Sequence, residues 1–141
     1  MTQGARLVVE KGETIAVRTS DDVVRVRQAV RALAIEAGFG IVDQTKLVTA
    51  ASEIARNTVV YGGGGTLRIE IVREGTRRGV QLTFSDDGPG IADIATAMTD
   101  GYTTGGGLGL GLSGAKRLSN EFSIESTPGK GTTVTLARWK L

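Results

Sequence analysis

Two glycine-rich segments lie on either side of a short stretch in the second half of the chain. Residues 86–91 read Asp-Asp-Gly-Pro-Gly-Ile, and residues 105–112 read Gly-Gly-Gly-Leu-Gly-Leu-Gly-Leu. Upstream, residues 53–57 read Glu-Ile-Ala-Arg-Asn, and downstream, residues 129–132 read Gly-Lys-Gly-Thr. A nucleotide site needs a base pocket, a phosphate cradle and a metal ligand. These four segments, called boxes below, contain residues suited to all three.

The composition is typical of one compact globular domain, which we expect to span residues 1–141. The 21 glycines are about double the ordinary usage and cluster in loops. A net charge of +2 and an aromatic content of 4% argue against nucleic acid as a partner. No stretch is long and apolar enough to cross a membrane, and no signal peptide begins the chain, so we expect a cytoplasmic protein.

The chain contains neither cysteine nor histidine. Without cysteine, disulfides and thiolate metal sites are excluded. Without histidine, the chain lacks the usual general base, the usual zinc ligand and any phosphohistidine acceptor of its own.

Hydrophobic periodicity predicts the secondary structure. Alternation of apolar and polar residues predicts strands at 13–19, 66–73, 79–85, 122–126 and 132–138. Helical spacing predicts helices at 23–37, 43–61 and 110–121 and a short one at 91–100. We expect residues 20–22 to cap the first helix and Asp43 the second. Paired strands with helices between them favour an α+β, two-layer α/β sandwich: a mixed, mostly antiparallel sheet with about three helices on one face.

Glu53 and Asn57 share one face of the second predicted helix. The Asn57 carbonyl is a hard oxygen ligand that suits Mg²⁺, and the Glu53 carboxylate one turn away suits a general base. Taken alone, the pair is more typical of a solvated helix face. The pair indicates a functional site only in combination with the other boxes.

Asp86 stands at the end of a predicted strand, where its carboxylate can accept a hydrogen bond from the exocyclic amine of adenine. Gly88 and Gly90 would let the backbone approach a flat ring closely. Taken alone, this box is equally an ordinary Asp-Gly turn. The same holds for residues 129–132, where a turn is the simpler interpretation and Thr132 would otherwise hydrogen-bond near the base.

The segment 101–112 carries the sharpest physical argument. Successive glycine N–H groups form an anion-binding nest, and the N-terminus of the following helix adds its dipole. Gly109 and Gly111 each cost a helix about 1 kcal/mol relative to alanine, so their presence at a helix start indicates close approach to a ligand. The alternative is a mobile surface loop. Neither a P-loop nor a dinucleotide-binding fingerprint fits the segment.

Taken in order, the boxes resemble the N, G1, G2 and G3 boxes of the GHKL ATPase/kinase superfamily with its Bergerat fold, over about residues 43–138. The resemblance implies Asn57 as the Mg²⁺ ligand and Asp86 as the acceptor of the adenine amine. It also implies an ATP lid within residues 92–107, mobile without nucleotide. The residues implied to bind ATP are Asn57, Asp86, Gly88, Gly90, Ile91, Thr104, Gly105, Gly106, Gly107, Leu108, Gly109, Gly111, Leu112 and Thr132.

Within this superfamily, residues 52–57, 100–109 and 116–118 resemble the RsbT-type switch kinases of the RsbT/RsbW anti-sigma regulatory family. Val60 stands where histidine kinases usually carry a basic residue, which separates the chain from them. The resemblance implies a serine/threonine kinase that phosphorylates a STAS-domain antagonist, RsbS- or RsbR-like, within a stressosome. Glu53 would accept the proton of the substrate hydroxyl, and Arg56 would help to neutralise phosphate. Once released, the kinase would activate a PP2C-type phosphatase through its regulatory domain.

Two other functions remain open at this point. The first is an RsbW-like anti-sigma factor, which sequesters a sigma factor through a protein interface. The second is an adaptor that binds ATP and transfers nothing. The presence of Glu53 and Asn57 speaks against the adaptor, because a decayed site commonly loses its base or its metal ligand.

Overall fold

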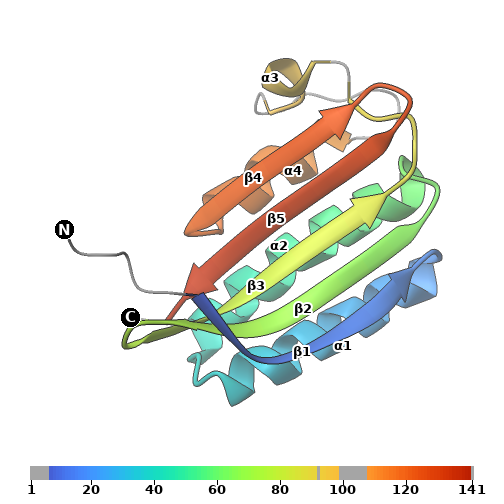
Figure 1. Ribbon diagram of the computed structural model, residues 1–141. Coiled ribbons are helices and arrows are strands. Elements are labelled where there is room, and N and C mark those ends of the chain that lie inside the picture. Colours follow the sequence, from blue (N-terminus) through green and yellow to red (C-terminus); the bar gives the residue numbers. More distant parts are fainter. Residues whose placement is uncertain (1–6, 92, 99–107, 141) are drawn as a thin grey trace.

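The computed structural model describes residues 7–91, 93–98 and 108–140, with residues 108–110 described by their backbone alone. Figure 1 shows the order of the elements along the chain. Their bounds are β1 (Leu7–Val17), α1 (Ser20–Glu36), α2 (Ile41–Val60), β2 (Gly65–Glu74), β3 (Arg77–Asp86), α3 (Ile94–Ala97), α4 (Leu108–Arg117), β4 (Glu121–Thr127) and β5 (Gly131–Trp139).

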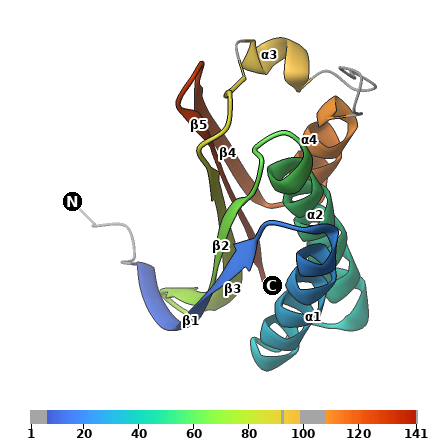
Figure 2. The same ribbon diagram turned by 90° about the vertical axis from the view of Figure 1, so that its right-hand side faces the viewer.

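The five strands form one sheet in the order β1-β2-β3-β5-β4, and every neighbouring pair is antiparallel. Helices α1, α2 and α4 cover one face of this sheet, which Figure 2 shows edge-on, and α2 packs between α1 and α4. The predicted two-layer α+β sandwich is therefore confirmed. The sequence favours a mixed sheet, whereas the strands described here contain no parallel pair.

Strand β5 lies between β3 and β4, and this insertion builds the site. Its antiparallel register places Asp86, the last residue of β3, opposite Thr132 near the start of β5. Two boxes that are 46 residues apart in sequence therefore meet at one end of the sheet.

The core lies between the sheet and the helices. Alternate residues of β2 and β3 are fully buried against the helix layer, as their apolar periodicity predicts, and each such side chain contributes about 1.5–3 kcal/mol by leaving water. The largest of them are Leu67, Ile69, Ile71, Leu82 and Phe84, which meet Leu47 and Ile54 of α2.

The two helix starts differ from the sequence prediction. Helix α1 is capped by Thr19, one residue before the predicted capping segment, because its hydroxyl and the Asp22 carboxylate form a reciprocal capping box. The expectation that Asp43 caps α2 is wrong, since that helix begins at Ile41 with Gly40 as its N-cap. Asp43 lies in the first turn and pairs with Arg138.

The other elements begin or end a few residues from the predicted bounds. Strand β1 begins at Leu7, earlier than predicted. The periodicity does not reveal its first residues, because they are exposed and do not alternate between apolar and polar. The helix predicted over 91–100 is only the four residues of α3, which Asp93 caps. Helix α4 begins at Leu108, so Gly109 and Gly111 lie inside its first turns.

Asp22 gives the fold a testable pH dependence. Its carboxylate accepts N–H bonds from Arg18 at 2.9 Å and Thr19 at 3.1 Å, and these bonds, with Arg25 beside it, lower the pKa of Asp22 below its usual 3.8. A lowered pKa in the folded state stabilises the fold above the unfolded pKa, and this contribution disappears as the pH falls through the folded value. We expect Asp22→Asn to lower the melting temperature at pH 7, with a deficit that shrinks below about pH 3.8. A deficit that stays constant from pH 7 to pH 3 would contradict this assignment.

Candidate functional site

A pocket opens at the end of the sheet where β3 and β5 meet the C-terminal half of α2. It encloses about 480 Å³, a volume that includes the open space at its mouth. The walls are mostly apolar, with a few polar groups among them. The lining residues are Ile54, Asn57, Thr58, Tyr61, Gly62, Phe84, Asp86, Pro89, Gly90, Ile91, Leu112, Thr132 and Val134.

The carboxylate of Asp86 is held in a fixed orientation at this pocket. One oxygen, Oδ1, accepts the backbone N–H of Gly88 at 2.9 Å and that of Thr132 at 3.3 Å. The other oxygen, Oδ2, accepts no hydrogen bond from the residues that the structure describes. An ionised carboxylate only accepts hydrogen bonds, so Oδ2 offers the pocket an acceptor suited to an N–H donor of a ligand.

The loop that follows β3 forms one wall of the pocket, and Gly90 fixes its course. Gly90 has a φ of +76°, and a Cβ there would lie 2.3 Å from the carbonyl oxygen of Thr127. No other residue type fits this close approach. Gly88 lies behind the wall against Gly62 and does not line the pocket, whereas Ile91 does.

A hydroxyl pair ties this loop to the β4–β5 turn. Ser126 Oγ accepts the backbone N–H of Ile91 at 2.6 Å and lies 2.8 Å from Thr132 Oγ1. It also donates to the carbonyl of Gly131 at 3.1 Å. Ser126 thus positions two pocket residues, Ile91 and Thr132, and sequence reasoning missed it because a serine in an alternating strand carries no distinguishing signal.

Glu53 and Asn57 lie on the side of α2 that faces α4. A Cβ on Gly111 would lie 3.1 Å from Asn57 Nδ2 and 3.2 Å from Glu53 Oε2, so this glycine lets the two helices meet at the predicted metal and base residues. Asn57 lines the pocket, whereas Glu53 does not. The Glu53 carboxylate lies 3.4 Å from the exposed guanidinium of Arg56. Leu112, the residue after Gly111, is buried and lines the pocket.

We expect Gly111→Ala to separate activity from stability. A Cβ at this position must displace Asn57 or Glu53 by a few tenths of an ångström, while alanine favours the helix by about 1 kcal/mol. Phosphoryl transfer should therefore fall by about tenfold or more, as expected for misplaced reacting groups, with no loss of melting temperature. Gly114→Ala in the same helix is the control, because a Cβ there meets nothing within 4 Å. Equal activity of the two variants would show that the contact at residue 111 is unimportant.

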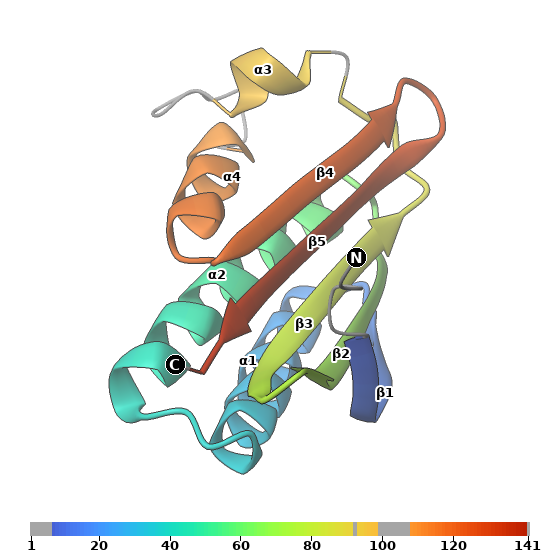
Figure 3. The same ribbon diagram turned by 60° about the vertical axis from the view of Figure 1, so that its left-hand side comes forward.

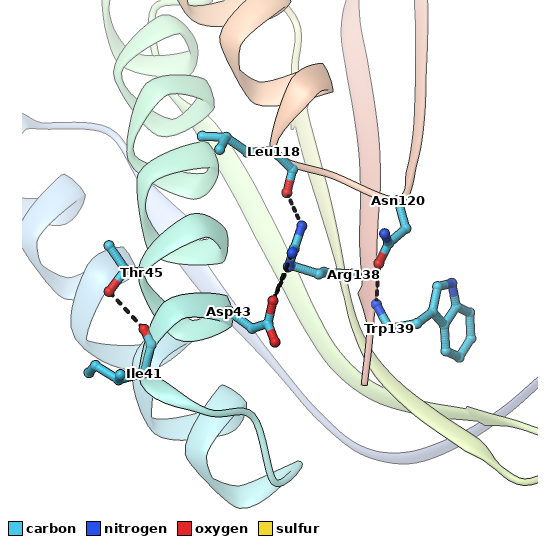
Figure 4. A network of polar contacts seen from close by, with 7 residues as sticks. All are labelled: Ile41, Asp43, Thr45, Leu118, Asn120, Arg138 and Trp139. Atoms are coloured by element: carbon cyan, nitrogen blue, oxygen red, sulfur yellow. Dashed lines mark hydrogen bonds and ion pairs between the residues drawn. The ribbon is translucent and has the colours of Figure 1, made fainter. Parts of the chain in front are cut away.

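The opposite end of α4 is anchored through Arg138 of β5, as Figure 4 shows. The largely buried Arg138 guanidinium donates to the carbonyl of Leu118 at 2.8 Å, just past the end of α4, and to Asp43 Oδ1 at 2.7 Å. Asn120 accepts the backbone N–H of Trp139 at 2.7 Å. The start of α2 and the end of α4 are therefore held on the same strand, β5, and Figure 3 shows these three elements side by side. The pocket lies at the other end of α2.

Part of the predicted site lies outside the residues that the structure describes. Thr104, Gly105, Gly106 and Gly107 lie outside the described residues, as does most of the predicted lid. Leu108 and Gly109 are the first two residues of α4, described by their backbone. Sequence reasoning also missed most of the apolar wall, including Phe84 and Val134.

Two features are absent from the part of the chain that the structure describes. No group of three or more histidine, cysteine, aspartate or glutamate side chains is arranged to hold a metal ion. None of the described helices has the length and the apolar character needed to cross a membrane.

Comparison with known proteins agrees with this architecture. The model of the family described as "Histidine kinase-, DNA gyrase B-, and HSP90-like ATPase" matches residues 42–141. The chain is 46% identical over 125 residues to the serine/threonine-protein kinase RsbT of Bacillus subtilis, covering 89% of this chain and 94% of that protein. It is 30% identical over 119 residues to the anti-sigma F factor of a Thermoanaerobacter species, covering 80% and 82% of the two chains.

A solved structure shows the same fold. The RsbU and RsbW domains of Rv1364c from Mycobacterium tuberculosis superpose with a TM-score of 0.63 at 22% identity. The match covers 96% of this chain and 33% of that longer one. The family model, the similarity to RsbT and the shared fold lead to one conclusion: this chain belongs to the histidine kinase-, DNA gyrase B- and HSP90-like (GHKL) ATPase family.

Proposed function

We propose that this chain is an ATP-dependent serine/threonine kinase of a bacterial partner-switching pathway, working in the cytoplasm. One observation carries the nucleotide half of the proposal. The Asp86 carboxylate is fixed by two backbone N–H groups in an apolar pocket, and its Oδ2 accepts no hydrogen bond from the described residues. Adenine brings a flat apolar ring and an exocyclic amine, which match the wall and the acceptor.

The positions of Asn57 and Glu53 support a role in phosphoryl transfer. Asn57 lies at the pocket, and Glu53 lies one helical turn before it toward α4. In the proposed reaction, the hydroxyl oxygen of a substrate serine or threonine bonds to the γ-phosphorus of ATP. The bond between the γ-phosphorus and the bridging oxygen breaks, ADP leaves, and Glu53 accepts the hydroxyl proton.

Asn57 fits the role of a magnesium ligand. Its side-chain carbonyl is a hard oxygen donor at the pocket. Mg²⁺ bound with ATP would neutralise charge on the transferring phosphoryl group. In this proposal, the N–H groups at the start of α4 would bind the triphosphate, and residues 104–107 would extend that cradle.

The similarity to RsbT supports the choice of substrate and partner. We propose that the phosphoacceptor is a serine or threonine of an RsbS- or RsbR-like STAS-domain antagonist in a stressosome. We further propose that the released kinase activates a PP2C-type phosphatase by binding its regulatory domain. The 46% identity to RsbT extends over 94% of that protein, so the similarity that supports this proposal covers nearly all of the relative.

A second candidate is an RsbW-like anti-sigma factor. The 30% identity to an anti-sigma F factor favours it, although less strongly than the RsbT similarity favours the kinase switch. Phosphorylation of a STAS protein does not separate the two candidates, since RsbW-type proteins also phosphorylate one.

Partner binding separates the two candidates. The chain would be titrated by calorimetry against the PP2C-type phosphatase and against the sigma factors of the same genome, with phosphatase turnover measured in parallel. The kinase switch predicts binding and activation of the phosphatase and no complex with a sigma factor. A stable complex with a sigma factor and an unaffected phosphatase would replace the proposal by the anti-sigma alternative.

A further inference from the structure

Helices α1 and α2 form a second groove, on the side of α2 opposite to α4. It is lined by Val24, Arg27, Gln28 and Arg31 of α1 and by Val48 of α2, and it encloses about 600 Å³ including its mouth. None of these residues lines the nucleotide pocket. The groove can therefore be occupied without blocking the pocket.

The residues along the groove follow helical spacing. Val24, Gln28, Arg31 and Ile35 recur at steps of three and four, so they form one stripe along α1. Arg31 donates to Gln44 Oε1 of α2 across the pair of helices at 3.4 Å. From Val24 to Ile35 the stripe spans eleven residue steps, or about 16 Å, which is close to three turns of a helix laid along it.

Exposed apolar side chains lie in the groove and beside it, and they contribute little to the core. Val24, which lines the groove, is 50% exposed. Ile35, at the other end of the same stripe of α1, is 56% exposed, and Ile41 at the start of α2 is 68% exposed. Valine and isoleucine at this exposure on adjoining helices indicate a contact surface rather than scattered surface residues.

The middle of the groove is positively charged. No ion pair within the described residues neutralises Arg27 or Arg31, whereas the neighbouring Arg25 is paired with Asp22. The surface therefore combines apolar ends with two guanidinium groups between them. The complement of this pattern is an amphipathic helix with apolar residues at both ends and aspartate or glutamate at its centre.

We propose that the α1–α2 groove binds such an acidic amphipathic helix, and that this helix belongs to the phosphatase that the chain activates. The identity of the partner rests on the proposed function. A protein substrate has to bring its hydroxyl to Glu53, which lies on the side of α2 that faces α4. The groove lies on the side that faces α1, so it suits an effector target rather than the phosphoacceptor.

The test uses the full chain with two groove variants, Val24→Asp and Arg27→Glu. The matched control is Arg68→Glu, the same charge reversal at an exposed position of β2, outside both the groove and the nucleotide pocket. We expect the groove variants to raise the concentration for half-maximal phosphatase activation by about tenfold or more, as for a central contact residue. Phosphorylation of the STAS protein by the same variants should stay at the wild-type rate.

Charge exchange makes the test specific. In the presence of Arg27→Glu, a glutamate-to-lysine change at the centre of the phosphatase helix should restore activation. Groove variants that activate the phosphatase like wild type would overturn the groove assignment alone. Variants that lose STAS phosphorylation while still activating the phosphatase would assign the groove to the substrate and overturn the proposal. A wild-type chain that phosphorylates but activates no phosphatase would instead overturn the partner named in the proposed function.

Discussion

Asn57→Ala is expected to lower phosphoryl transfer from Mg·ATP by about a hundredfold or more while leaving the fold intact. Asn57 lies at the pocket beside the start of α4, and its side chain is only half-buried, so truncation opens no cavity in the core. The loss would come from the oxygen ligand and from the position of the metal relative to the phosphates.

Nucleotide binding provides a readout besides activity. In the wild-type chain, ATP affinity should fall when Mg²⁺ is chelated, and in Asn57→Ala this dependence should be much weaker. Asn57→Asp keeps an oxygen ligand at the same position, so it should recover part of both properties. Transfer at the wild-type rate by Asn57→Ala, with an unchanged melting curve, would refute the assignment of Asn57 as a metal ligand.

Asp86→Asn is expected to weaken ATP by about tenfold or more and GTP by much less, because a hydrogen bond to a charged group contributes about 1.5–3 kcal/mol. Two backbone N–H groups fix Oδ1, which leaves Oδ2 as the acceptor for the amine of adenine. An asparagine that keeps these two bonds presents its NH₂ group there instead. Guanine carries a carbonyl at the corresponding position and loses no such bond.

Competition against a fluorescent nucleotide gives both affinities in one assay. Asp87→Asn is the matched control, because this neighbouring carboxylate is exposed and does not line the nucleotide pocket. The ratio of the GTP and ATP dissociation constants is the quantity to compare, since a general loss of stability would change both affinities alike. Equal losses for the two nucleotides would show that Asp86 does not read the base.

The local parts of the fold followed from local patterns. Alternation in residues 66–85 predicted the β2–β3 hairpin, and helical spacing predicted the buried face of α2, because burial on one side imposes a fixed period on each element. The cap of α2 was misassigned because Asp43 is held by Arg138, a residue that the sequence places 95 positions away. Sequence alone cannot tell a capping side chain from one that pairs with a distant strand.

The assembly of the site depended on long-range pairing. The sequence identified Asp86 and Thr132 separately, but only the insertion of β5 beside β3 shows that the Thr132 N–H holds the Asp86 carboxylate. Ser126 was missed for the same reason, since its importance lies in contacts with Ile91 and Thr132 rather than in a motif. The structure adds a reason for Gly111 that the sequence does not show, which is the close packing of α4 on Asn57.

Transfer of the γ-phosphoryl group of ATP to a protein hydroxyl is the activity that we propose for this pocket. The most direct measurement incubates the chain with γ-labelled ATP, Mg²⁺ and the STAS-domain proteins of the same genome, with Glu53→Ala as the control. We predict label on a serine or threonine of one STAS protein, and its loss in the Glu53→Ala variant although that variant still binds ATP. Absence of label from every STAS protein, despite measurable ATP binding by the wild-type chain, would contradict the claim.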